Sequence, residues 1–141
     1  VIDDGSDAAA VQKLTDAIRK AGAVAKIVAP KIGGVRLSHG KSLAVDGQLA
    51  GTPSVVFDAV AVVLSAASGK KLGSEAAAID FVRDAYGHLK AIAFDEGGKV
   101  LLDQANVSAD RGVIPADQVG QFVSLACQRF WTREPLIRTL P

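Results

Sequence analysis

The run Ala59-Val60-Ala61-Val62-Val63-Leu64 decides the fold, because it is apolar at every position. A strand with one face in water alternates apolar and polar residues, whereas a continuous apolar run is typical of a strand covered on both faces, as in a parallel sheet. A second buried strand is expected at residues 91–94, and a helix over residues 74–86 precedes it. This succession predicts an α/β domain.

The flanking segments continue the alternation of strands and helices. Val1-Ile2 has the character of a first strand already under way, so a longer parent chain is expected. Ser6 or Asp7 caps a helix that runs to about Ala21. The other expected elements are a strand over 24–29, an antiparallel hairpin with arms 35–38 and 41–45, a turn at 46–47, loops over 65–73 and 95–98, a strand over 112–114, a helix over 115–130 and an irregular tail over 131–141. The order predicts a flavodoxin-like, doubly wound parallel sheet with helices on both faces and a small β-hairpin insertion.

Length and composition indicate one globular domain over residues 1–141. The net charge of +1 argues against a nucleic-acid partner, which needs a basic excess on one face. No apolar run reaches the roughly 20 residues that span a bilayer, so no membrane partner is expected either. The single cysteine, Cys127, cannot form an internal disulfide, so the fold does not depend on an oxidising compartment.

Acidic and basic residues follow two of the expected strands, at the sheet edge where doubly wound folds bind ligands. Asp3 and Asp4 would hold Mg²⁺ only with an aspartate after the central strand, where Ser65 stands, so we interpret them as turn residues and Asp7 as a helix cap. Ser68-Gly69-Lys70-Lys71 lacks the first glycine and the final Ser/Thr of a phosphate loop. A solvated basic loop is favoured there over an anion site.

The tight glycine turn after Phe94 is the place where a nucleophile elbow would stand. Asp95 and Glu96 occupy it, and a carboxylate acts as a nucleophile when a basic or metal partner activates it. His88 and Lys90 lie at the other end of the same strand. An acidic turn is therefore favoured over a catalytic one.

The remaining reactive side chains are isolated in the sequence. Cys127 falls inside the expected last helix and is predicted to be a small buried hydrophobe. His39 lies in the hairpin turn, and His88 follows a helix whose last carbonyls would suit a cation. Tyr86 is predicted to be a core residue. Two separate histidines with no His/Cys cluster make no metal site, so we assign no catalytic, cofactor-binding or metal-binding residue.

Three longer stretches resemble the C-terminal domain of large-subunit haem catalases of the hydroperoxidase II type. The order and spacing of the stretches and the hairpin also agree with that domain, over nearly the whole chain. The stretches are Pro53-Ser54-Val55-Val56-Phe57-Asp58-Ala59-Val60-Ala61-Val62, Asp84-Ala85-Tyr86-Gly87-His88-Leu89-Lys90-Ala91-Ile92-Ala93 and Arg129-Phe130-Trp131-Thr132-Arg133-Glu134-Pro135-Leu136-Ile137-Arg138.

This resemblance implies that the parent protein is an enzyme and that this domain is non-catalytic. Large-subunit catalases are homotetrameric haem enzymes that dismute hydrogen peroxide to water and dioxygen, and their haem lies in a catalase body that residues 1–141 do not include. The resemblance therefore implies no haem in this domain, with the catalase body and neighbouring subunits of the homotetramer as its partners. It implies a cytoplasmic location for a bacterial protein and leaves secretion open for a fungal one.

The same domain is similar to PfpI-type proteases and glutamine-amidotransferase-like domains. Those enzymes carry a cysteine at the elbow, where Asp95 stands here, and an acidic residue near the stretch that corresponds to Asp7-Ala8-Ala9-Ala10. The resemblance implies a scaffold that stabilises the tetramer and shapes access to the active site. The tail from Trp131 and the hairpin are the expected contact surfaces. A chaperone-like holdase for unfolded clients and a residual PfpI-type hydrolase built on Asp95 and Glu96 remain as alternatives.

Overall fold

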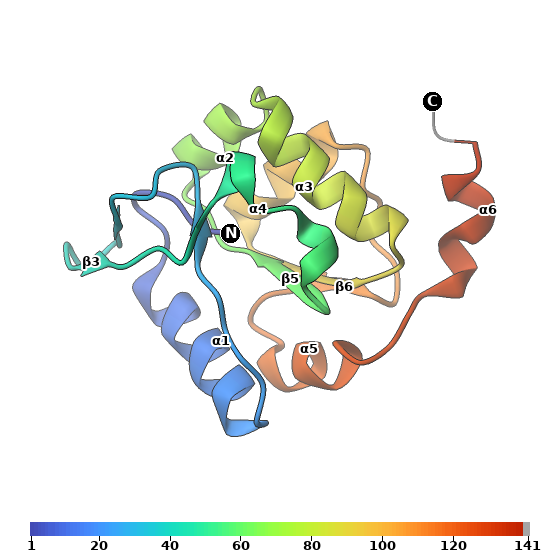
Figure 1. The fold of residues 1–141 in the computed structure, drawn as a ribbon, viewed down its shortest axis with the longest axis horizontal. Helices are drawn as coiled ribbons and strands as arrows, with labels where there is room; N and C mark the ends of the chain where they lie inside the picture. Colours follow the sequence, from blue (N-terminus) through green and yellow to red (C-terminus); the bar gives the residue numbers. More distant parts are fainter. Residues whose placement is uncertain (140–141) are drawn as a thin grey trace.

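The centre of the molecule is a parallel sheet. The computed structural model describes residues 1–139, and in it β5 (Ala59–Val62), β6 (Ala91–Phe94) and β7 (Val113–Pro115) pair in that order (Figure 1). Both pairings are parallel, with Val60 opposite Ile92 and Ile92 opposite Val113. The two apolar runs that the sequence marks as buried strands are therefore neighbours in the sheet.

The first two residues extend this sheet on its other side. β1 (Val28–Ala29) pairs in parallel with β4 (Gly47–Gln48). Val1-Ile2 lies between the two groups of strands, because Ile2 N donates to Val28 O at 3.0 Å and Val63 N donates to Val1 O at 3.0 Å. Counting Val1-Ile2 as the first strand gives the flavodoxin order 2-1-3-4-5 with β4 added outside. The predicted fold class is confirmed.

Helices cover both faces of the sheet (Figure 1). α1 (Ala8–Lys20) and α5 (Val119–Leu125) contact each other and pack on one face. α2 (Ala66–Leu72), α3 (Ala76–Gly87) and α4 (Glu96–Gln104) pack on the other. Each face has its own apolar cluster, and adjacent residues of the central strands contribute to opposite clusters, which is why the run at 59–64 carries no polar position.

The ends of α1 follow local sequence signals. The Asp7 carboxylate accepts a hydrogen bond from Ala10 N at 2.7 Å, as a helix N-cap does. At the other end Gly22 has φ of +81°, and Ala23 N donates to Ile18 O, which closes the helix with a Schellman motif. The cap and the end of this helix agree with the prediction.

The hairpin exists but is shorter than predicted. β2 (Val35–Arg36) and β3 (Ser42–Leu43) pair antiparallel around Gly40. Val35 and Leu37 are buried in the α1 face of the core. The expected exposure of these apolar side chains is therefore wrong, because they close the domain's own core. That the hairpin contacts a partner stays a prediction.

The sequence did not predict two of the helices, α2 and α4. Residues 66–72, expected to be a loop, form α2, which begins at the N-cap Ser65. Residues 95–98, expected to be a sharp loop, contain the N-cap and first turn of α4. Both helices carry glycines, Gly69 within α2 and Gly97 and Gly98 in the first turn of α4. Glycine disfavours a helix interior by about 1 kcal/mol relative to alanine, and close packing of the two helices on each other overrides that preference.

Three other boundaries also differ, and so does the burial of Cys127. The strand expected over 24–29 is confined to β1, and Val24 is 76% exposed. Gly47, expected in a turn, starts β4. The helix expected over 115–130 is α5 alone, because Pro115 is the last residue of β7. Cys127 lies beyond the end of α5 and is exposed, so its predicted burial is wrong.

Short helical turns complete the chain. η1 (Leu49–Gly51) and η2 (Ser54–Val56) precede β5. The tail, expected to be irregular, contains η3 (Trp131–Arg133) and α6 (Glu134–Ile137), and Pro135 lies in the first turn of α6, where proline is favoured. Pro141, the other proline of the expected tail, lies outside the described residues. Within residues 1–139, no helix combines the length and the apolar character needed to cross a bilayer.

Candidate functional site

The corner between β6 and α4 is the candidate site, because a nucleophile would stand there in an elbow. Asp95 occupies it with φ of −101° and ψ of −173°, which is an ordinary extended conformation. A nucleophile elbow holds its residue in a strained turn. The backbone at Asp95 carries no such strain.

The Asp95 carboxylate is occupied by backbone donors. Oδ1 accepts a hydrogen bond from Gly98 N at 2.7 Å, which caps α4. Leu64 N lies 3.1 Å from both carboxylate oxygens. The side chain therefore joins the end of β5 to the start of α4, and it uses its acceptors for structure.

Burial raises the pKa of Asp95, and the negative charge of Asp7 raises it further. The hydrogen bonds from the backbone of Gly98 and Leu64 oppose this rise but do not cancel it. A carboxyl group with a raised pKa is a candidate functional group only where a charge partner or a substrate cleft accompanies it.

A shallow depression lies beside Asp95 and is acidic. Its volume is about 330 Å³. Among the described residues, those that line it include three carboxylates and no basic side chain: Asp7, Ala10, Leu64, Ala66, Asp95, Glu96 and Gly97. Asp7, at the start of α1, does come close to the elbow as the PfpI-type resemblance implies. A carboxylate without a basic partner has no group to activate it as a nucleophile.

Close backbone packing fixes this corner. A Cβ on Gly97 would lie 2.0 Å from Leu64 O, and one on Gly98 would lie 2.3 Å from Val62 O. A Cβ on Gly69 of α2 would lie 2.2 Å from Gly97 O. The glycines thus let the backbone of α4 approach both the end of β5 and α2 closely.

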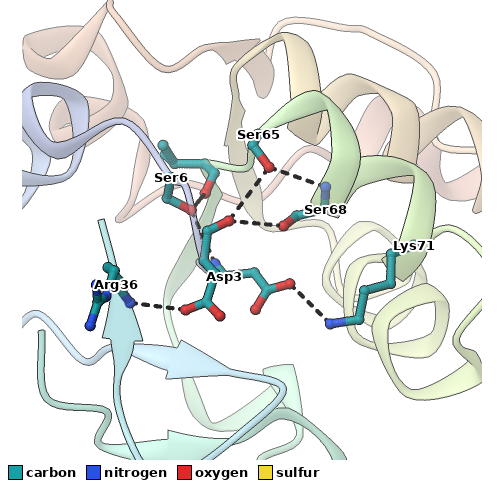
Figure 2. A network of polar contacts seen from close by, with 8 residues as sticks. Asp3, Ser6, Arg36, Ser65, Ser68 and Lys71 are labelled. Atoms are coloured by element: carbon teal, nitrogen blue, oxygen red, sulfur yellow. Dashed lines mark hydrogen bonds and ion pairs between the residues drawn. The ribbon is translucent and has the colours of Figure 1, made fainter. Parts of the chain in front are cut away.

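The acidic pair after the first strand is tied to α2 and the hairpin (Figure 2). Asp3 is buried and forms an ion pair with Lys71 at 3.2 Å. The Asp4 carboxylate accepts from Arg36 N at 2.9 Å, and its carbonyl accepts from the Ser68 hydroxyl at 3.1 Å. As predicted, the pair lies in a turn, in which Gly5 has φ of +83°.

These contacts also involve two residues of the basic stretch. Ser68 and Lys71, expected in a solvated basic loop, belong to α2 and contact Asp4 and Asp3 (Figure 2). Ser6 adds a buried bridge, accepting from Asp3 N and donating to Val63 O at 2.6 Å. The network stabilises the junction of the first strand, α1 and α2.

The isolated side chains stay apart. His39 is exposed and accepts from Lys41 N, and His88 contacts the carbonyl of Asp84 in the last turn of α3 at 2.7 Å. Tyr86 is buried in the core, as predicted. Within residues 1–139, no three His, Cys, Asp or Glu side chains gather as a metal site would require.

Two buried cations, which the sequence did not predict, lie near the amino-terminal ends of the strands, opposite the Asp95 corner. Lys90 is 4% exposed, and its Nζ donates to the carbonyls of Ser54, Val55 and Phe57 at 2.9, 2.8 and 2.5 Å. Burial lowers its pKa, and the nearby positive charge of Arg129 lowers it further. The position of Lys90 directly before a buried strand is the one sequence signal that could have pointed to it.

Arg133 is the second buried cation, at 1% exposure. Its Nε and Nη2 donate to the two carboxylate oxygens of Asp110 at 2.5 and 3.0 Å, and Nη1 donates to Lys90 O at 2.7 Å. The guanidinium also lies 4.6 Å from the ring centre of Tyr86 and 4.9 Å from that of Phe130. These contacts fix the start of the tail on the sheet.

A family model covers almost the whole chain. The family model described as the C-terminal domain found in long catalases matches residues 1–135. The chain belongs to this family. The resemblance drawn from the three long stretches is thereby confirmed.

Relatives of this catalase C-terminal domain are catalases of greater length. The chain is 36% identical over its whole length to a catalase HPII of Pseudomonas aeruginosa and 35% identical over 96% of its length to a catalase C of Rhizobium meliloti. It spans only 21% and 20% of those two proteins. The match therefore identifies a domain and leaves most of each relative uncovered.

Solved structures show the wider fold of this catalase C-terminal domain. Drosophila melanogaster DJ-1beta aligns with a TM-score of 0.74 at 15% identity, over 91% of this chain and 88% of that one. A ThiJ/PfpI domain protein from Brachyspira murdochii aligns with a TM-score of 0.72 at 13% identity, over 99% and 94%. At these identities the likeness concerns the fold alone, which agrees with the predicted PfpI-like scaffold.

Proposed function

We propose that this chain is the non-catalytic C-terminal domain of a haem-dependent catalase, and that it stabilises the tetramer and shapes access to the active site of its parent. The parent reaction would be the dismutation of hydrogen peroxide to water and dioxygen, with the haem held by the catalase body. The catalase body and the neighbouring subunits would be the partners of the domain.

The carboxylate of Asp95 carries this proposal. It stands at the elbow, and it accepts hydrogen bonds from Leu64 and Gly98 instead of facing a basic partner. The residues around it bring more negative charge. A domain that keeps a rigid fold and has no activated group at its elbow suits a structural role, and family membership supplies the parent.

The proposal is tested on the full-length catalase with and without this domain. We expect both proteins to turn over hydrogen peroxide before heating. On heating, we expect the truncated protein to lose activity and dissociate at a lower temperature than the full-length protein. Residual activity after heating and the subunit mass by light scattering measure the two effects. Equal heat resistance of the two proteins would refute the stabilising role.

Two substitutions in the same full-length protein test whether the carboxylate of Asp95 takes part in catalysis. Asp95→Asn removes the carboxylate charge, and Glu96→Gln changes the exposed neighbour that contributes no cap. Peroxide turnover should be the same in both variants as in the parent. A peptidase or amidase activity that Asp95→Asn abolishes and Glu96→Gln keeps would instead favour a residual hydrolase.

A further inference from the structure

Two side chains hold the tail on the domain. Among residues 126–139, which follow α5, only Phe130 and Arg133 are buried. α6 buries no residue and lies at the margin of the molecule (Figure 1). Two large apolar clusters hold the sheet and its helices, and residues 126–139 contribute only Phe130 to them. Because few buried contacts mean low local stability, detaching the tail should require less free energy than unfolding the sheet.

Phe130 and Arg133 occupy one slot beside Gly112. A Cβ on Gly112 would overlap both the Phe130 ring and Nη2 of Arg133, so glycine leaves the space that the two side chains fill. They also contact each other, because the guanidinium lies 4.9 Å from the centre of the Phe130 ring. Burial of a guanidinium is tolerated only while its partners stay in place, and Asp110 is the counter-charge here. The two side chains should therefore leave the slot together.

The slot adjoins a strained corner between α3 and β6. Leu89 has φ of +63°, and a Schellman motif usually carries glycine at this position. The motif is present, because Leu89 N donates to Tyr86 O and Lys90 N donates to Ala85 O, both at 3.0 Å. Strained backbone of this kind persists where its surroundings fix it.

The tail supplies part of that fixation. Phe130 N donates to Leu89 O at 2.9 Å, and Nη1 of Arg133 donates to the next carbonyl, Lys90 O, at 2.7 Å. Two successive carbonyls of the strained corner thus accept hydrogen bonds from the two residues that hold the tail. The conformation of Leu89 and the position of the tail should depend on each other.

We propose that residues 130–133 form a tail latch, which opens and closes as one unit while the sheet stays folded. When the latch is closed, it holds Leu89 in its strained conformation. When it opens, residues 89 and 90 lose both hydrogen bonds to the tail, and the corner relaxes. The Lys90 ammonium binds three carbonyls within residues 54–57, so opening of the latch should also loosen the η2 turn before β5.

Native-state amide hydrogen exchange of the full chain in dilute urea, followed by NMR, tests whether the latch opens separately. The amides of Phe130 and Arg133 should exchange through one opening that depends only weakly on urea, because little surface is exposed when the latch opens. They should exchange at least about tenfold faster than the amides of β5 and β6, whose exchange requires unfolding of the sheet. Equal rates and equal urea dependence in the tail and in these strands would overturn the inference.

Gly112→Ala tests the slot, because the added Cβ occupies the space of the latch. Exchange of the Phe130, Arg133 and Lys90 amides should accelerate by at least about tenfold, while the sheet stays folded and the amides of β5 and β6 stay protected. The control is Gly120→Ala in α5, where the added Cβ meets no atom within 4 Å and these rates should not change. Unchanged tail amides in Gly112→Ala would overturn the latch, and an unchanged Lys90 amide would overturn its coupling to the corner.

Arg133→Lys gives a second test without crowding the slot. Lysine keeps the positive charge but loses the paired hydrogen bonds and the stacking on aromatic rings. The Phe130 amide should exchange at least about tenfold faster, because the two side chains leave the slot together. The control is Arg138→Lys, the same substitution at a side chain that is 75% exposed. An equal Phe130 rate in both variants would overturn the role of Arg133 in the latch.

Discussion

At the residue scale, Asp95 illustrates how a reactive position can become a structural one. Its carboxylate caps α4 and accepts the buried Leu64 N–H. Asp95→Ala should lower the free energy of unfolding by about 1–3 kcal/mol, because the cap is lost and a buried donor is left unpaired. Urea unfolding of the chain measures this loss. Glu96→Gln, at an exposed neighbour, is the control, and an equal effect of the two substitutions would contradict the role of Asp95.

A second residue, Asp110, makes a pH-dependent contribution to the free energy of unfolding. Burial alone would raise the pKa of Asp110, but hydrogen bonds and charge from Arg133, together with the Gly112 N–H, outweigh it and lower the pKa. A lowered pKa means that the fold favours the charged form. The stabilisation is therefore complete above the unfolded pKa of about 3.9 and is lost as the pH falls through the lower folded pKa.

Asp110→Asn should consequently cost about 3 kcal/mol at pH 7, because it leaves the buried Arg133 without its counter-charge. The difference from the unsubstituted chain should shrink as the pH falls below about 4, where Asp110 of the unfolded chain begins to take up a proton, and continue to shrink down to the lower folded pKa. Urea unfolding at pH 7, 5, 4 and 3 checks this trend. A difference that stays constant over the series would show that the charge of Asp110 is not what stabilises Arg133.

At the element scale, the contact of α4 with α2 and β5 depends on glycines. Gly97→Ala would place a Cβ 2.0 Å from Leu64 O, a backbone atom that cannot move alone. We expect a loss of about 3 kcal/mol in the free energy of unfolding, the upper end of the usual cost of overpacking, because the neighbour is backbone. Gly87→Ala, at the end of α3 with no atom within 4 Å of the added Cβ, should be neutral or stabilising by up to about 1 kcal/mol. Thermal melts compare the two, and similar melting temperatures would contradict the packing argument.

The glycines also explain why α2 and α4 could not be predicted from the sequence. In residues 96–98 they look like a turn, and in α2 one glycine stands beside two lysines. Helix preference is a local property, whereas the reason for glycine here is a contact with chain 28 or more residues away. α1 and α3 could be predicted from the sequence, because their apolar spacing is local and the Asp7 cap of α1 is adjacent to it in the chain.

At the scale of the whole molecule, the first strand of the chain is inserted at the centre of the sheet. Ile2 hydrogen bonds to Val28, and Val1 accepts from Val63, so the N-terminal residues join the two groups of strands. Both apolar clusters share this sheet. The domain should therefore unfold as one cooperative unit.

Amide hydrogen exchange tests whether the first strand is an integral part of the sheet. The slowest exchange should occur in β5 and β6, which lie in the interior of the sheet, and in Ile2, which closes it. The segments over residues 23–26 and 31–34 lie outside the strands and should exchange fastest. Exchange at Ile2 as fast as at those segments would mean that the first strand is not an integral part of the sheet.

The sequence by itself determined the parallel α/β class, the two buried strands, the cap of α1 and the carboxylate at the elbow, because each depends on apolar periodicity or on residues adjacent in the chain. It also carried the long stretches that identify the family. Only the tertiary structure decided that Lys90 and Arg133 are buried and that Asp95 is fully hydrogen bonded. Their distant partners lie 33–36 residues away for Lys90, 23 and 43 for Arg133 and 31 for Asp95, and no local pattern encodes which distant groups a charge will meet.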